Sequence, residues 1–461
     1  MPSWFGSSGI RGSYDEITPF LSLNLGIAVS KSFQSSAPAY IASDIRFTSD
    51  LLKACFKSGF SYSSGTIIDI GLCPTPVISY ITSINSNSLG VMVTASHNPP
   101  SNNGFKFFLN GGECGEIFET EVEKNLQNLL KGENSRRGPQ NSWKSVGTSK
   151  YDNSKTYINE YINYLNSKIR ISKLKIKLIL DCATNVPNLV SPDVFKRLGV
   201  DVVTINETLN PTFPGRPSEP SSANLSDLKK AVVEEGADIG VAHDGDGDRF
   251  AIIDEKGNFV NSTAIISFFC DNLDYSNPDR RSVVLTSDCT QQSLDIVEKK
   301  GAELIISRIG RNRDFVNEEK FIFLAEPNKL LFPDLGKWID GLFPVLKLLE
   351  ISQARQISKA LAPYDKRKIL RKAFKISNGD RIRETKLIND LPDLWSKKIT
   401  KTSVLDGLKI YFKDNSSVLI RFSGTEPKIK FYIESDSESK NHDILVTLKK
   451  FFDLRSAGFD C

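Results

Sequence analysis

Features of several large protein classes are missing from this chain. No apolar run approaches the ~18 residues that a membrane-spanning helix needs, and the first residues lack the basic and apolar regions of a signal peptide. The 59 Lys and Arg residues nearly balance the 55 Asp and Glu residues, which leaves a net charge of +4 spread along the chain. We therefore expect a cytoplasmic protein that has neither a membrane nor a nucleic acid as a partner.

Cysteine and histidine patterns typical of metal sites are missing as well. The 7 cysteines contain no Cys-x-x-Cys pair, and the 3 histidines are His97, His243 and His442. Zinc sites need such clusters, and disulfide frameworks are rare in cytosolic proteins, so both are disfavoured. The cysteines are expected to be free thiols.

The chain is long enough for three or four domains. Its 461 residues compare with ~150 residues in a typical domain. Apolar runs typical of strands alternate with amphipathic stretches typical of helices, and this alternation predicts an α/β protein. The predicted strands include residues 40–42, 66–70, 90–93, 176–180, 239–241, 283–286 and 303–306.

Changes in composition suggest where one domain ends and the next begins. Residues 132–153 are rich in Gly, Ser, Asn and Arg, which is typical of a linking loop. Residues 206–224 contain four prolines, so we expect a structured loop beside a site. Beyond about Arg355 the alternation weakens, and 418–422 and 428–434 are typical of two strands in a small α+β domain. The predicted domains are 1–150, 151–255, 256–365 and 366–461.

An acidic loop joins the predicted strand 239–241 to the next strand. In it, Asp244, Asp246 and Asp248 alternate with glycines that allow a tight curve. Carboxylates held so close together repel one another, and a bound hard cation such as Mg²⁺ would explain their presence. A calcium loop of the EF-hand type is disfavoured because Arg249 occupies the position where that loop needs glycine. An acidic surface turn is the other alternative.

Ser96 lies in a constrained loop, Thr94 to Pro100, directly after a predicted strand, where α/β proteins expose reactive groups. A hydrolase triad is disfavoured because the Gly-x-Ser-x-Gly motif is absent and His97 is poorly placed as a base for its neighbour. Ser96 is interpreted either as a carrier of a phosphoryl group or as a loop-capping hydroxyl. Lys106 lies between apolar residues, where burial could lower its pKa enough for proton exchange near neutrality. A lysine that extends from a strand to solvent is the alternative.

A second loop, near the C-terminus, combines Arg421, Ser423, Gly424 and Thr425 and is soon followed by Lys430. One arginine, two hydroxyl groups and a glycine in a tight turn form an anion-binding nest that fits a phosphomonoester. A hairpin with incidental charge is the alternative.

Together these segments resemble the α-D-phosphohexomutases, which move a phosphoryl group between the carbon-1 and carbon-6 oxygens of a hexose. The resemblance follows the family's order through nearly the whole chain. Its motifs are Phe5 to Gly12, Thr94 to Pro100, Thr212 to Arg216, Asp244 to Arg249 and Arg421 to Pro427. It implies three similar α/β domains with mixed sheets, followed by an α+β domain that resembles the TATA-box-binding-protein fold.

The resemblance also implies roles for the matching residues. The implied catalytic residues are Ser96 as the phosphorylated serine, Arg249 and Arg11 as cations beside the transferring group, and His97 and Lys106 as proton-handling residues. The implied Mg²⁺ ligands are Asp244, Asp246, Asp248 and the phosphate on Ser96. The residues implied to hold the non-reacting phosphate are Arg421, Ser423, Gly424 and Thr425, with Lys430 beside them.

The sugar-reading loop departs from the family's Gly-Glu-x-Ser-Gly-His pattern. The corresponding residues, 325–330, retain Glu326 and have Asn328 where the family has serine, but lack the glycines and the histidine. Glu326 is expected to accept hydrogen bonds from sugar hydroxyls, or from the ammonium group of a glucosamine phosphate.

The resemblance therefore predicts a mutase that interconverts hexose 6-phosphate and hexose 1-phosphate through a phosphoserine and a 1,6-bisphosphate. Hexose 1,6-bisphosphate is expected as the primer and Mg²⁺ as the cofactor. The sequence leans toward glucosamine phosphate as substrate, with glucose or mannose phosphate as the alternative. A non-catalytic sugar-phosphate-binding relative and a phosphatase are alternatives of other classes.

Overall fold

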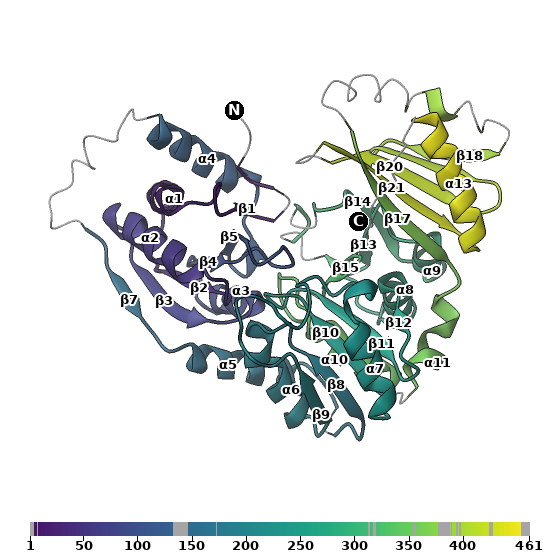
Figure 1. The fold of residues 1–461 in the computed structure, drawn as a ribbon, viewed down its shortest axis with the longest axis horizontal. Helices are drawn as coiled ribbons and strands as arrows, with labels where there is room; N and C mark the ends of the chain where they lie inside the picture. Colours follow the sequence, from purple (N-terminus) through teal and green to yellow (C-terminus); the bar gives the residue numbers. More distant parts are fainter. Residues whose placement is uncertain are drawn as a thin grey trace. The chain divides into compact units, whose positions relative to one another are not determined.

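The computed structural model describes residues 4–6, 8–131, 146–171, 173–311, 314–316, 320–353, 356–376, 388, 390–392, 395, 398–423 and 427–452. By their contacts these residues fall into two units, and Figure 1 shows their helices and strands coloured along the sequence. The first unit draws on Met1–Val260, Arg313–Glu319 and Asn328–Ala360, and the second on Asn261–Asn312, Lys320–Pro327 and Leu361–Cys461. None of the described helices is long and apolar enough to cross a membrane.

The first sheet of the first unit is mixed. Its strands are β1 (Ile10–Ser13), β2 (Ala39–Ser43), β3 (Ile67–Leu72), β4 (Leu89–Val93), β5 (Asn102–Leu109), β6 (Gly112–Glu113) and β7 (Ser149–Tyr151). They lie in the order β1-β5-β4-β2-β3-β7, with β6 paired to β5. Strand β5 is antiparallel to both of its main neighbours, while β4, β2, β3 and β7 are parallel. The helices packed around this sheet are α1 (Pro19–Ser32), α2 (Ser49–Tyr62), α3 (Thr75–Ile84) and α4 (Glu116–Leu130).

Side chains alternate across the central strand β4, so helices cover both faces of the sheet. Leu89, Val91 and Val93 belong to one buried core together with residues of α1, α2 and α4. Gly90 points the other way, and a Cβ at that position would lie 2.6 Å from Ile78 of α3. The carboxyl end of β4 leads directly into the loop of Ser96.

The second sheet of the first unit carries the acidic loop. Its strands are β8 (Lys177–Asp181), β9 (Asp201–Ile205), β10 (Ile239–His243), β11 (Phe250–Asp254) and β12 (Phe259–Val260), in the order β12-β11-β10-β8-β9. Strands β10, β8 and β9 are parallel, and β11 returns antiparallel to β10 after the acidic loop. The nearby helices are α5 (Ser154–Ser167), α6 (Ser191–Arg197) and α7 (Ser226–Glu234). The first unit also contains β16 (Lys329–Leu331) and α10 (Phe343–Ser352).

The second unit contains two sheets. One sheet contains three parallel strands in the order β14-β13-β15. These strands are β13 (Ser282–Thr286), β14 (Glu303–Ser307) and β15 (Phe321–Glu326), and they pack with α8 (Ser262–Asn272) and α9 (Gln291–Lys299). The other sheet is antiparallel in the order β17-β21-β20-β19-β18. Its elements are β17 (Lys368–Lys375), β18 (Ile399–Ser403), β19 (Leu408–Phe412), β20 (Ser417–Phe422), β21 (Lys428–Ser435) and the covering helix α13 (Glu438–Phe451).

The predicted α/β class with mixed sheets is confirmed, and every predicted strand overlaps an observed one. Residues 206–224 form an irregular segment apart from a short 3₁₀ turn at Ser222–Asn224, as the prolines predict. The bounds of the four domains and the resemblance of the last domain to the TATA-box-binding-protein fold stay predictions.

Candidate active site

Ser96 lies just beyond the carboxyl end of β4, in the loop predicted to carry a reactive group. Its buried Oγ donates a hydrogen bond of 2.6 Å to Oδ2 of Asp244, which lies 148 residues further along the chain. The backbone φ of Ser96 is +52°, in the left-handed region that non-glycine residues rarely adopt. Its N–H donates to Oγ1 of Thr94 at 2.8 Å. The fold therefore holds this serine in a strained conformation beside the acidic loop.

The three aspartates of the acidic loop converge. One oxygen atom from each of Asp244, Asp246 and Asp248 lies within 4.8 Å of the others, and all three residues are buried. Among the described residues, no hydrogen-bond partner reaches the buried Oδ1 atoms of Asp246 and Asp248. Burial raises the pKa of Asp244, and the charges of Asp248 and Asp246 raise it further. Buried carboxylate oxygens without donors fit a hard divalent cation such as Mg²⁺.

Gly245 allows the acidic loop, residues 244–249, to approach the loop of Ser96, residues 94–100, which is called the serine loop below. A Cβ at this position would lie 2.6 Å from Oγ of Ser218 and 2.8 Å from the carbonyl oxygen of Ser96. Any side chain larger than hydrogen would push the two loops apart. From the start of α3, Oγ1 of Thr75 donates a further hydrogen bond of 2.6 Å to Oδ2 of Asp246.

The expectation of a lowered pKa for Lys106 is wrong. The Nζ atom of this buried lysine lies 2.5 Å from Oδ2 of Asp246 and 2.5 Å from Oδ2 of Asp248. Burial lowers the pKa of Lys106, but these two carboxylates outweigh burial and raise the pKa above its ordinary value. The neighbours of Lys106 in β5 are apolar, and the charges that decide its pKa come from another sheet. Its implied part in proton transfer stays a prediction.

Arg11, Arg249 and His97 surround the same cluster. Burial lowers the pKa of Arg11, and Asp246 opposes this most strongly, which shows that the guanidinium group lies near that carboxylate. The Nδ1 atom of His97 lies 3.4 Å from Oγ of Ser96. Burial, followed by the charges of Arg249 and Arg11, holds the pKa of His97 well below its usual range. The imidazole ring is therefore neutral near pH 7.

Glu219 links two of the predicted residues, although the sequence did not identify it. Its Oε2 accepts a hydrogen bond of 2.7 Å from Nη1 of Arg249 and lies 3.9 Å from Nε2 of His97. Glu219 lies in residues 206–224, the proline-rich loop that the sequence predicts beside a site. This position is the feature of the sequence that could have identified it.

Arg46 is a second residue that the sequence did not identify. Its Nε donates to Oδ2 of Asp44 at 2.9 Å, and both side chains are fully buried. The other four donors of the guanidinium group reach backbone carbonyl oxygens at 2.6 to 2.9 Å. These carbonyl groups belong to Ser96, Asn98, Pro99 and Asn102. One side chain therefore fixes the backbone of the serine loop.

Arg216 holds the acidic loop in a similar way. Its Nε donates to Oδ2 of Asp181 at 2.7 Å, and its Nη2 donates to the carbonyl oxygen of His243 at 2.6 Å, one residue before the first aspartate. Nearby, Oγ of Ser218 donates to the carbonyl oxygen of Ser96 at 2.9 Å. The proline-rich loop is thus the segment that joins the serine and acidic loops.

The predicted phosphate-binding residues begin at the end of β20. Arg421 lies opposite Lys430 of β21 in the antiparallel pair, and the N–H of Ser423 donates to the carbonyl oxygen of Lys428 at 2.9 Å. Gly424 and Thr425 lie outside the described residues.

The predicted sugar-reading residues lie at and after the end of β15. Oε2 of Glu326 accepts a hydrogen bond of 3.0 Å from the N–H of Gly310. Asn328 has a φ of +67°, the left-handed conformation that asparagine tolerates in a turn.

The predicted site residues therefore fall into two groups. Those gathered in the first unit are Arg11, Ser96, His97, Lys106, Asp244, Asp246, Asp248 and Arg249. Those described in the second unit are Glu326, Arg421, Ser423 and Lys430. Asn328 belongs to the stretch Asn328–Ala360, which clusters with the first unit.

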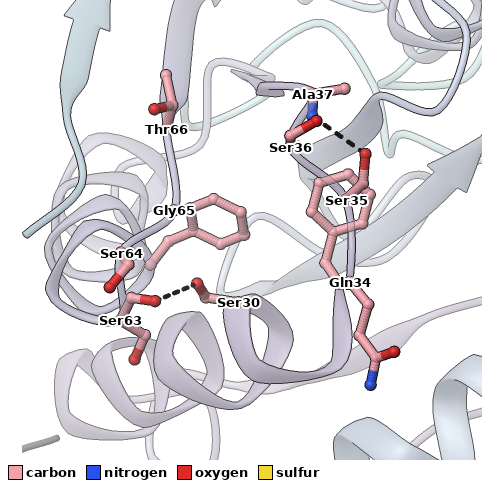
Figure 2. A pocket seen from close by; sticks show the side chains of 11 residues that line it. Ser30, Gln34, Ser35, Ser36, Ala37, Ser63, Ser64, Gly65 and Thr66 are labelled. Atoms are coloured by element: carbon pink, nitrogen blue, oxygen red, sulfur yellow. Dashed lines mark hydrogen bonds between the residues drawn. The ribbon is translucent and has the colours of Figure 1, made fainter. Parts of the chain in front are cut away.

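A separate hollow lies beyond the ends of α1 and α2. It has a volume of about 320 Å³, and Figure 2 shows the serines among the 11 residues that line it. Oγ of Ser30 donates to the carbonyl oxygen of Ser63 at 3.3 Å, and the N–H of Ala37 donates to Oγ of Ser35 at 3.1 Å. None of the lining residues is acidic, basic or a cysteine, so the hollow lacks the chemistry of the serine and acidic loops.

Family models match three stretches of the chain. They describe phosphoglucomutase/phosphomannomutase alpha/beta/alpha domain I, matched at residues 2–133, alpha/beta/alpha domain II, at 155–257, and the C-terminal domain, at 374–450. The chain belongs to the phosphoglucomutase/phosphomannomutase family. Membership of this family confirms the predicted resemblance to the α-D-phosphohexomutases and the predicted enzyme class, a phosphosugar mutase.

Two relatives of this mutase match over nearly their whole length. A phosphopentomutase of Thermococcus kodakarensis is 32% identical over 447 residues, which cover 95% of this chain and 95% of the relative. A probable phosphoglucosamine mutase of Methanosphaera stadtmanae is 30% identical over 458 residues, which cover 98% and 97%.

Two solved structures illustrate the similarity of fold. A phosphoglucomutase/phosphomannomutase family protein from Burkholderia thailandensis has a TM-score of 0.83 at 21% identity, with 98% of this chain and 97% of that chain covered. The N-acetylphosphoglucosamine mutase of Aspergillus fumigatus, in complex with GlcNAc-6P and magnesium, has a TM-score of 0.61 at 15% identity, with 97% and 95% covered. At these identities the likeness shows the fold.

Proposed function

We propose that this phosphosugar mutase interconverts hexose 6-phosphate and hexose 1-phosphate through a phosphorylated Ser96 and a hexose 1,6-bisphosphate. The observation that carries the proposal is the 2.6 Å hydrogen bond from Ser96 Oγ to Asp244, which holds a serine hydroxyl against a buried aspartate cluster. A protein that only bound sugar phosphates would have no use for such a hydroxyl. The arrangement therefore supports a mutase over a non-catalytic relative.

Asp244, Asp246 and Asp248 would hold Mg²⁺, with the phosphate on Ser96 as a further ligand. The bound ion supplies positive charge against the oxygens of the transferring phosphoryl group. In our proposal Arg249 and Arg11 add the chain's own positive charge around that group.

Each phosphoryl transfer exchanges one P–O bond for another. The bond from phosphorus to Ser96 Oγ breaks, the sugar hydroxyl oxygen bonds to phosphorus, and the hydroxyl proton passes to a base, while Ser96 Oγ gains a proton and becomes a hydroxyl group again. Because its Nδ1 lies 3.4 Å from Ser96 Oγ, His97 is placed for that role. The resulting bisphosphate turns end for end, so that its other phosphate returns to Ser96. The loop of Arg421, Ser423, Gly424 and Thr425 then binds the other phosphate of the sugar, which does not react in that step.

The proposed substrate is glucosamine phosphate, and the relative named as a probable phosphoglucosamine mutase supports this choice. Glu326 would accept hydrogen bonds from the sugar's ammonium group or hydroxyls. Glucose and mannose phosphates are the alternatives within the hexoses. A pentose phosphate is a second candidate, because the phosphopentomutase relative is 32% identical. The cytoplasmic location stays a prediction.

A side-by-side mutase assay tests the substrate. Glucosamine 6-phosphate, glucose 1-phosphate, mannose 1-phosphate and ribose 1-phosphate are compared in the presence of Mg²⁺ and catalytic glucose 1,6-bisphosphate. We expect the highest kcat/KM with glucosamine 6-phosphate, and a higher value with another sugar would replace the proposed substrate. Release of free phosphate in place of an isomerised sugar phosphate would support a phosphatase.

Replacing Ser96 tests the phosphoserine. We expect Ser96→Ala to lower kcat by roughly 10³-fold or more, because the variant has no phosphoryl acceptor, while sugar phosphates still bind. The exposed Ser101 follows the same loop, and Ser101→Ala is the matched control that keeps turnover. Mass spectrometry should find phosphate on Ser96 in the native enzyme. Normal turnover of Ser96→Ala would rule out the proposed mechanism.

A further inference from the structure

Three segments of the second unit meet at one edge of its parallel sheet. Strands β13, β14 and β15 are parallel, so the residues that follow them emerge on the same side. Ser287 follows β13, Ile309 and Gly310 follow β14, and Glu326 ends β15.

A carboxylate from the antiparallel sheet reaches this edge. Asp406 lies in the turn between β18 and β19, and its Oδ2 accepts hydrogen bonds from Ser287 Oγ at 2.8 Å and from the N–H of Ile309 at 3.0 Å. The ammonium group of Lys409 adds a hydrogen bond of 2.6 Å to the carbonyl oxygen of Ser287. The turn and the start of β19 therefore form hydrogen bonds with two of the three segments at the sheet edge, those that follow β13 and β14.

The same carboxylate also faces Arg421. Nη2 of Arg421 lies 3.4 Å from Oδ1 of Asp406, whose side chain is 8% exposed. Gly407 makes this approach possible, because its φ is +89° and a Cβ there would lie 2.2 Å from the carbonyl oxygen of Ile420. The turn can thus lie directly against the backbone of β20.

Two consecutive backbone amides complete the connection. The N–H of Ile309 donates to Asp406, and the N–H of the next residue, Gly310, donates to Glu326 at 3.0 Å. A chain of contacts therefore runs from Arg421 through Asp406 and the peptide of Ile309 and Gly310 to Glu326.

We propose that Asp406 is a positioning residue that couples phosphate binding at Arg421 to sugar recognition at Glu326. The proposal rests on the function proposed above, which assigns the phosphate and the sugar to these two residues. A phosphate that binds Arg421 competes with Asp406 for the same guanidinium group. Any resulting shift of Asp406 moves the N–H of Ile309, and with it the adjoining peptide that orients Glu326.

A double-mutant cycle measures this coupling directly. The cycle combines Arg421→Lys with Glu326→Gln and is read from kcat/KM with the best sugar phosphate. We expect the effects of the two substitutions to be non-additive by about fivefold. When the cycle is repeated in Asp406→Asn, which keeps the size of the side chain and removes its charge, the effects should become additive.

The structure offers a matched control at the other end of β19. Asp414 accepts hydrogen bonds from the N–H and Oγ of Ser416 and pairs with Lys440 at 2.8 Å, so it has the same kinds of partner as Asp406. Within the described part of the chain, it makes none of the contacts that connect Arg421 to Glu326. The cycle repeated in Asp414→Asn should keep its fivefold coupling, because a merely structural effect on the sheet would act in both variants.

Additivity in the enzyme with Asp406 intact, or coupling that persists in Asp406→Asn, would overturn the proposal. The same cycle is read from the dissociation constant of glucose 1-phosphate by calorimetry. If no sugar phosphate turns over, the proposed mutase function fails, while a coupling seen in the dissociation constants still supports the role of Asp406. If Arg421→Lys changes neither kcat/KM nor the dissociation constant, Arg421 does not bind the phosphate. The coupling proposal, which assumes that it does, then fails as well.

Discussion

At the scale of single residues, Arg46 and Arg216 are cations used for structure. Each forms an ion pair with a buried aspartate and also donates to backbone carbonyl groups, that of Ser96 for Arg46 and that of His243, just before the acidic loop, for Arg216. A guanidinium group suits this task because its five N–H groups point in fixed, planar directions. The strained conformation of Ser96 persists because Arg46 and Thr94 hold the backbone on both sides of it.

Arg46→Lys tests this role. Lysine keeps the charge but cannot reach four carbonyl groups and Asp44 at once, so several buried acceptors lose their donor. We expect kcat to fall by roughly 10²-fold and the free energy of unfolding to fall by about 3 kcal/mol. The measurements are steady-state kinetics and urea unfolding. The control is Arg197→Lys, since Arg197 bonds Asn163 at an exposed site. Activity within twofold of wild type in Arg46→Lys would contradict the assignment.

At the scale of secondary-structure elements, α2 packs against β3 through ion pairs as well as apolar contacts. Asp69 in β3 lies 2.6 Å from Nζ of Lys57 and 3.3 Å from Nζ of Lys53, and its Oδ1 accepts the N–H of Gly71 at 2.9 Å. Burial raises the pKa of Asp69, but the hydrogen bond from Lys57 and the charge of Lys53 outweigh it, so the pKa is lowered overall.

The pH dependence of Asp69→Asn follows from that direction. Because the pKa of Asp69 is lower in the folded state, its ionised form stabilises the protein above its ordinary pKa of about 3.9, and this stabilisation is lost as the pH falls through the folded value. We expect Asp69→Asn to cost about 2 kcal/mol at pH 7, with the difference from wild type shrinking below pH 4. Denaturant unfolding across pH measures this. Asp50→Asn, at an exposed partner of Lys53, should show a small difference at every pH. A difference that stays constant down to pH 3 would contradict the prediction.

At the scale of the whole molecule, the aspartate cluster joins two sheets of the first unit. Ser96 follows β4 and Lys106 lies in β5 of the first sheet, while Asp244, Asp246 and Asp248 lie between β10 and β11 of the second. A cation at the aspartates would bind the folded unit and not the unfolded chain, because the ligands converge through folding.

Thermal unfolding with and without Mg²⁺ tests this link. At a Mg²⁺ concentration 100 times Kd, binding adds about 2.7 kcal/mol, so the melting temperature should rise with Mg²⁺ and fall again with a chelator. Asp248→Asn should remove most of the rise, because one of three carboxylates is lost. Glu235→Gln, which alters an exposed ion pair with Lys177, should keep it. An equal rise in Asp248→Asn would mean that the ion binds elsewhere.

The sequence by itself determined the class of fold and the residue types that the candidate site brings together. Apolar periodicity is local, so strands such as β4 and β10 could be predicted, and the alternating aspartates of residues 244–248 lie within one loop whatever surrounds it. The resemblance to the phosphohexomutases rested on such short motifs, and the family models confirm it.

The tertiary structure alone decided which groups meet. It placed Ser96 against Asp244 and gave Lys106 two carboxylate partners, so that its pKa rises where its own segment predicted a fall. It also directed Arg46 and Asp406 at loops remote in sequence. A pKa or a buried hydrogen bond depends on charges and donors within a few ångströms, and folding brings those from distant parts of the chain.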